Sequence, residues 1–192
     1  MKQKNKHLAF IMFSLMFSSY NAVADGMNAG TVHFTGEIIE PSCVIDGNDG
    51  KDNNVPLGSY PTSLFAEVGD QSTLQPFDIS LKDCPVQTDG LSSVQLTFEG
   101  TTVASSNSEL LTVSSITTQG TTAATNVGIA VSLQETPTSL LTLDGAEDQI
   151  VIALRPTTDN IRASFFARYK AYAIPVTAGP ADADMTVNIL YR

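Results

Sequence analysis

The feature that most constrains this chain is a recurrence of large apolar residues at every second position. It appears in segments 77–81, 94–98, 127–133, 150–154 and 185–191, and Gly, Pro, Asn or Asp residues lie between these segments. A two-residue period is typical of β-strands with one buried face, and no segment keeps the longer period of a helix. Many short strands separated by turn residues predict an all-β sandwich.

The connecting segments carry weaker signals. We expect a short edge strand at 55–58, one helical turn within 62–68 and a polar loop at 101–108. The acidic loop at 46–54 lacks the ligand spacing of a helix–loop–helix calcium site, so we interpret it as a solvated loop.

The first 24 residues carry the pattern of a secretory signal peptide. Three lysines precede an apolar run at 8–17, and Ala22-Val23-Ala24 supplies a small-x-small cleavage site. The run is shorter than the roughly 20 residues that a membrane-spanning helix needs. We therefore expect a signal peptide over residues 1–24, cleaved after Ala24, with an uncleaved signal anchor as the alternative.

The exported part of the chain is acidic. The whole sequence has a formal net charge of −10, and removal of the three N-terminal lysines makes the charge −13. An acidic surface argues against nucleic acid and anionic lipid as partners. Residues 25–192 are enough for one domain with a substantial core.

The sequence has two cysteines, Cys43 and Cys84. In an exported protein a single pair most simply forms one disulfide. The chain-entropy model gives a stabilisation of about 4 kcal/mol for a loop of this length. A metal or redox pair is the alternative, but these cysteines lack close spacing and a nearby histidine.

The residue types that carry catalysis are sparse. After residue 24 the only histidine is His33, and no serine lies in a Gly-x-Ser-x-Gly setting. The glycines fall at turns rather than in a phosphate-binding loop. We therefore predict a protein that is not an enzyme and that has no catalytic residue, cofactor or metal site.

The stretch near the start of the exported chain also alternates. Asn28, Gly30, Val32 and Phe34 share one side of an extended strand. A lone strand satisfies neither its backbone groups nor its apolar side, so it needs a partner. The pattern leaves two readings: residues 30–36 are the first strand of their own sandwich, or they pair with another copy of the protein.

Several motifs, taken together and in order, resemble a known family. They are Gly30-Thr31-Val32-His33-Phe34-Thr35-Gly36-Glu37, Cys43, Pro76-Phe77-Asp78-Ile79-Ser80-Leu81-Lys82-Asp83-Cys84, Ala124-Thr125-Asn126-Val127-Gly128, Leu143-Asp144-Gly145, Phe166-Ala167-Arg168-Tyr169 and Ala183-Asp184-Met185-Thr186-Val187. With Tyr191 next to last, the chain resembles the major structural subunits of type 1-like fimbriae, which the chaperone–usher pathway of Gram-negative bacteria assembles. The likeness runs through nearly the whole exported chain.

The resemblance implies an immunoglobulin-like sandwich over residues 37–192 that lacks its last, seventh strand. It also implies that residues 25–36 are an N-terminal donor strand, with Asn28, Gly30, Val32 and Phe34 filling the groove of another subunit. The strand beside that groove would be 185–191, whose inward residues are Met185, Val187, Ile189 and Tyr191.

The implied partners are other copies of the chain, neighbouring fimbrial subunits, a periplasmic chaperone that first lends a strand, and an outer-membrane usher. The implied location is the periplasm and then the fimbria on the cell surface, where the fibre supports adhesion. Two alternatives share the fold: a minor adaptor subunit, and a self-contained immunoglobulin-like adhesive module. A periplasmic hydrolase is a third alternative, from the enzyme class.

Overall fold

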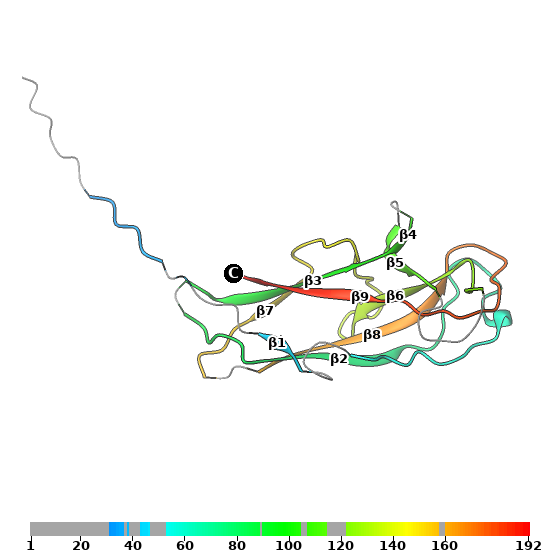
Figure 1. Cartoon of the computed structure of the whole chain (residues 1–192), viewed down its shortest axis with the longest axis horizontal. Coiled ribbons are helices and arrows are strands. Elements are labelled where there is room, and N and C mark those ends of the chain that lie inside the picture. The colour runs from blue at the N-terminus through cyan, green and yellow to red at the C-terminus, as the bar shows by residue number, and fades with distance from the viewer. Residues whose placement is uncertain are drawn as a thin grey trace, which may run out of the picture. The chain divides into compact units, whose positions relative to one another are not determined.

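The computed structural model describes residues 31–36, 38, 43–46, 53–88, 90–104, 107–114, 122–157 and 160–192. The chain divides into two compact units, Met1–Thr35 and Gly36–Arg192. The second unit is a sandwich of two antiparallel sheets (Figure 1). Its described elements are β1 (Val44–Ile45), the 3-10 helix η1 (Thr62–Leu64), β2 (Gln75–Lys82), β3 (Ser93–Gly100), β4 (Thr102–Ala104), β5 (Asn107–Thr112), β6 (Val127–Leu133), β7 (Ile150–Ala153), β8 (Ile161–Ala171) and β9 (Met185–Tyr191).

The larger sheet has the strand order β1-β2-β8-β6-β5-β4, and the smaller sheet has the order β7-β3-β9. Every pair of described strands is antiparallel. Phe77 of β2 lies opposite Phe165 of β8, and Phe98 of β3 lies opposite Val187 of β9. The strands at all five segments with the two-residue period are present, which confirms the predicted all-β sandwich.

The core lies between the sheets and is filled by the inward residues of the alternating segments. Its largest fully buried apolar side chains are Phe98, Phe165, Leu81, Leu96, Leu143 and Val94. The ring of Phe165 packs edge-on against Phe98 at 5.6 Å between centroids and stacks on Phe77 at 5.4 Å. Each such side chain stabilises the fold by about 1.5–3 kcal/mol relative to exposure.

Two expectations for the connecting segments are wrong. Residues 55–58 form no strand, although Leu57 is buried in the core. This segment buries an apolar side chain without joining a hydrogen-bonded ladder, and Pro56 has no N–H to give to one. Residues 101–108 are not simply a loop, because β4 and the start of β5 pair there and Thr112 N–H donates to the Thr101 carbonyl at 2.7 Å. The predicted helical turn within 62–68 is present as η1.

The first unit is described only over its last residues. Residues 31–35 adopt no regular secondary structure, and the side chains of Val32 and Phe34 are 75% and 93% exposed. The predicted signal peptide at 1–24, and Asn28 and Gly30 of the predicted donor strand, lie outside the described residues. No helix in the described part of the chain is long and apolar enough to cross a membrane.

Candidate functional site

The last strand, β9, is an edge of the smaller sheet and is buried less completely than its neighbour. The three inward side chains of β3 that face β9 are Val94, Leu96 and Phe98, and all have an exposure of 0%. Their cross-strand partners are Tyr191, Ile189 and Val187, and these side chains, like that of Met185, are only partly buried. The apolar core therefore becomes accessible along β9.

The backbone of β9 also has unpaired N–H and C=O groups at Met185, Val187, Ile189 and Tyr191, on the side away from β3, as far as the described residues show. The N–H of Arg192 donates to the Ser93 carbonyl and the N–H of Ser93 donates to the Arg192 carbonyl, both at 2.9 Å. Hydrogen-bonded and non-hydrogen-bonded pairs alternate in an antiparallel ladder. The N–H and C=O groups of Met185, Val187, Ile189 and Tyr191 therefore point away from β3, and no described residue bonds to them.

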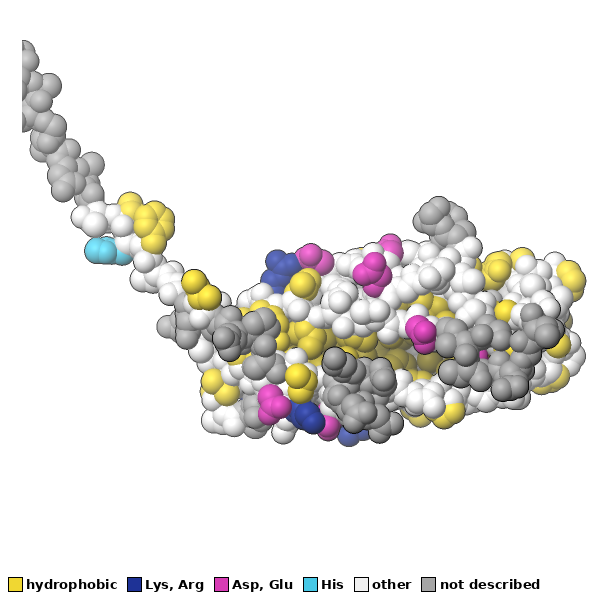
Figure 2. Space-filling model, viewed as in Figure 1, with side chains coloured by type: hydrophobic (Ala, Val, Ile, Leu, Met, Phe, Trp, Pro, Cys, Tyr) yellow, Lys and Arg dark blue, Asp and Glu magenta, His cyan; other side chains and the backbone are white. Residues whose placement is uncertain are grey.

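The opposite wall of this opening belongs to the larger sheet. Phe77 of β2 is partly buried, whereas Phe165 beside it is fully buried. Ile45 of β1, opposite Leu81, is also partly buried against the core. Figure 2 shows hydrophobic side chains along the middle of this face, between β9 and β2. We call the opening between β9 on one side and β1 and β2 on the other the edge groove.

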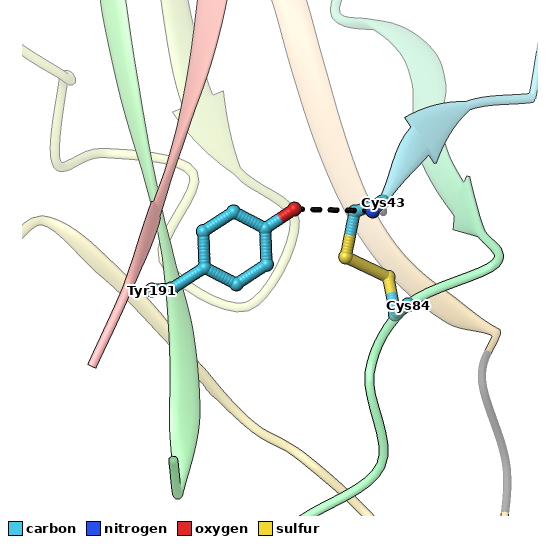
Figure 3. Close-up of a disulfide and its surroundings, with 3 residues drawn as sticks. All are labelled: Cys43, Cys84 and Tyr191. Carbon is cyan, nitrogen blue, oxygen red and sulfur yellow. Dashed lines mark hydrogen bonds between the residues drawn. A yellow bond between two sulfur atoms is a disulfide. The ribbon is translucent and has the colours of Figure 1, made fainter. Parts of the chain in front are cut away.

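One end of the edge groove is closed by a hydrogen bond between its two walls. The backbone N–H of Cys43 donates to the hydroxyl oxygen of Tyr191 at 3.0 Å (Figure 3). Cys43 forms a disulfide with Cys84, which lies two residues after β2. The disulfide is as predicted, and it fixes the start of β1 to the end of β2.

The other end of the edge groove leads to a cavity of about 270 Å³, whose lining includes Tyr60, Tyr169, Val176 and Ala181. The Tyr169 hydroxyl donates to the Ala181 carbonyl at 3.0 Å, four residues before β9 begins. Burial raises the pKa of the Tyr169 hydroxyl, and the nearby Asp182 carboxylate adds to this effect. Tyr169 therefore remains a neutral hydrogen-bond donor at ordinary pH.

The geometry of the edge groove matches one kind of ligand. An apolar floor beside a row of free backbone donors and acceptors fits an extended strand, whose side chains fill the floor and whose backbone completes the ladder. The structure places all four predicted β9 residues on one face and on one edge. Val32 and Phe34 are exposed, and their assignment to a donor strand stays a prediction.

Sequence reasoning did not identify Phe77, Ile45, Tyr60 or Tyr169 as groove residues. Alternation in 77–81 places Phe77 on an inward strand face, but alternation does not say which inward position lies next to an unfilled edge. That information comes from the sheet order, which places β9 and β1 at edges of their sheets.

Comparisons with known proteins agree with this geometry. Residues 32–192 match the model of the family described as fimbrial protein. The chain is 38% identical over 175 residues to the uncharacterized fimbrial-like protein SfmA of Escherichia coli strain K12, covering 91% of this chain and 89% of that one. It is 34% identical over 194 residues to the type-1 fimbrial protein A chain of Salmonella typhi, covering 98% and 100%.

A solved structure shares the fold. The crystal structure of the P pilus rod subunit PapA aligns with a TM-score of 0.61 at 22% identity, covering 79% of this chain and 99% of that one. At 22% identity this match supports the fold alone, whereas the family model and the two sequence relatives establish the family. The chain belongs to the fimbrial protein family and is a structural fimbrial subunit.

Proposed function

We propose that this subunit polymerises by strand exchange, with residues 25–36 of one copy lying in the edge groove of the next. One observation supports the proposal above all. The same four residues of β9, Met185, Val187, Ile189 and Tyr191, have partly buried apolar side chains and backbone groups that bond no described residue. Strand addition of this kind is the recognised mode of chaperone–pilin complexes. The mechanism involves no chemical step.

The donor residues have the properties that the edge groove requires. Val32 and Phe34 are 75% and 93% exposed, so both gain from transfer to an apolar floor. Complete burial of each contributes about 1.5–3 kcal/mol, and the added ladder satisfies the open backbone of β9. The twelve residues 25–36 exceed the seven of β9, so the donor is long enough to pair along the whole edge.

This pairing joins different surfaces of identical subunits. A head-to-tail contact that does not close into a ring produces an open filament. Each copy then donates at one position and accepts at another, and the fibre grows on the cell surface. The subunit's partners in the fibre are further copies and neighbouring fimbrial subunits.

A subunit with an open edge strand is at risk of aggregation before assembly. We therefore propose that the chain passes through the periplasm bound to a chaperone whose strand occupies the edge groove, and that an outer-membrane usher then receives it. The predicted signal peptide at 1–24 supplies the route of export.

Deletion of residues 25–35 tests the proposal. The shortened subunit should fold on the chaperone and fail to form fibres, as seen by electron microscopy and by the loss of heat-resistant oligomers on gels. The matched control replaces Thr31 and Thr35, on the other side of the strand, by Ser, and should polymerise normally. Fibre growth of the deletion variant at the normal rate would overturn the proposal.

A further inference from the structure

Four exposed apolar side chains gather at one end of the sandwich. Leu64 and Val68 are 41% and 62% exposed, and Tyr172 and Ile174 are 37% and 50% exposed. The N–H of Gly69 donates to the Ala171 carbonyl at 2.9 Å, which holds the two segments side by side. They flank an open cleft of about 590 Å³, lined by Thr62, Ser63, Phe65, Ala66, Ile174, Pro175 and Val176. We call this surface the end patch.

The end patch is continuous with the edge groove. Its cleft shares Thr62, Phe65 and Val176 with the 270 Å³ cavity. That cavity is also lined by Ala181 and Asp182, which lead into the first residues of β9. A strand that leaves the edge groove at its Met185 end therefore passes directly to the end patch.

The direction of the donor strand follows from the sheets themselves. Every pair of described strands is antiparallel, and antiparallel pairing is slightly more stable per residue than parallel pairing. An added strand that runs antiparallel to β9 ends beside Met185. The body of the donor subunit then begins at the end of the acceptor that carries the end patch.

The connection to the donor's body is short. Residues 36–43 join the donor strand to the disulfide, and eight extended residues span at most about 29 Å. The donor's disulfide end is thus held near the acceptor's end patch. The disulfide end of each subunit also has exposed apolar side chains. Val44 is 40% exposed and Val86 is 44% exposed, and they lie close in sequence to Cys43 and Cys84.

We propose that the end patch of each subunit packs against the disulfide end of its donor neighbour, so that strand exchange is reinforced by a second contact between bodies. This inference rests on the proposed strand exchange and adds the contact surfaces to it. In one molecule the two surfaces lie at opposite ends: Figure 1 shows η1 at one end of the sandwich and the C-terminal end of β9 toward the other. The contact therefore forms only between copies.

Cross-linking of assembled fibres tests this contact. The variant I174C, labelled with a photoactivatable maleimide and incorporated into fibres, should cross-link to peptides of the neighbour that contain Val44 or Val86. The matched control V151C carries the same label on β7, where Val151 is 57% exposed. It should give no cross-link to those peptides. Cross-links from I174C that map only to other peptides would overturn the proposal.

A measurement on unaltered protein covers the case in which I174C does not assemble. Hydroxyl-radical labelling of Tyr172 and Ile174 should fall severalfold when the subunit passes from its chaperone complex into the fibre. Unchanged labelling of both residues would refute the end-to-end contact. The two proposals fail separately. If deletion of residues 25–35 abolishes fibres, but Tyr172 and Ile174 of the unaltered subunit are labelled equally in the fibre and in the chaperone complex, strand exchange is supported and only the end-to-end contact is wrong.

Discussion

The hydroxyl oxygen of Tyr191 accepts a hydrogen bond from the backbone N–H of Cys43 at 3.0 Å, and this bond joins residues that are 148 positions apart. Tyr191 ends the edge strand of the smaller sheet, and Cys43 immediately precedes the edge strand of the larger one. The disulfide then connects Cys43 to the segment after β2. The penultimate tyrosine thus holds the two walls of the edge groove together at one end.

Replacement of Tyr191 by Phe should destabilise the subunit by about 1 kcal/mol, because the partly buried ring remains and one hydrogen bond is lost. Urea unfolding of the monomeric subunit measures this free energy. Tyr172→Phe is the matched control, since Tyr172 is exposed and its hydroxyl bonds no described residue. Equal stability of the two variants would show that the Cys43–Tyr191 bond contributes nothing.

Gly128 of β6 lies where the backbone of β5 approaches closely. A Cβ atom at this position would be 2.8 Å from the Leu111 carbonyl oxygen and 3.1 Å from the Leu110 Cβ. Gly128→Ala should therefore cost about 1–3 kcal/mol of unfolding free energy, because the ladder between β5 and β6 must shift. Gly90→Ala is the control, since nothing lies within 4 Å of the added atom. Thermal unfolding of the two variants gives the comparison, and similar melting temperatures would contradict it.

The sandwich itself was predictable, because the alternation in segments such as 77–81 and 185–191 indicates which face of each strand is the more buried. The buried charge of Arg168 on β8 was not predictable in this way. Arg168 is 2% exposed, and its guanidinium donates to the Ser132 hydroxyl at 2.9 Å and to the Pro137 carbonyl at 2.8 Å. Pro137 belongs to the segment that follows β6, and this segment lies against the outward side chain of Arg168 on β8. The periodicity within a strand cannot predict such a contact, because it depends on where a connecting segment folds back.

The edge groove was predictable only in part for a similar reason. The sequence placed Val187 and Ile189 on an inward face, and the resemblance to fimbrial subunits implied a missing neighbour. Phe98 is fully buried and Val187 is only partly buried because β3 is the central strand of the smaller sheet and β9 is an edge strand. The local sequence pattern does not predict this strand order. The end patch has the same origin, since it combines residues of 62–68 with residues that follow β8.

The ion pair between Asp78 of β2 and Arg162 of β8 should appear in the acid stability of the subunit. Hydrogen bonds from Arg162 and then from Ser164 hold the pKa of the Asp78 carboxyl below its ordinary value. A lowered pKa gives stability that is complete above the unfolded pKa of about 3.9 and is lost as the pH falls through the folded value. Asp78→Asn should therefore flatten the loss of stability below pH 4, as measured by thermal unfolding across an acid pH series. Asp83→Asn is the control, and an identical acid profile for wild type and Asp78→Asn would contradict the prediction.

The two faces of β9 offer the sharpest test of the edge groove. Val187 points its side chain into the groove and its backbone to the open edge, whereas the neighbouring Asn188 is exposed on the outer face. Val187→Asp places a charge where the donor strand brings apolar side chains, and an unpaired buried charge is strongly unfavourable. This variant should lose polymerisation and should lose binding of a peptide spanning residues 25–36. Asn188→Asp adds the same charge one residue away and should retain both. Circular dichroism of each isolated variant shows that it is folded, independently of any strand that binds the edge groove. A Val187→Asp subunit that is folded and binds the peptide with unchanged affinity would show that the donor strand lies elsewhere.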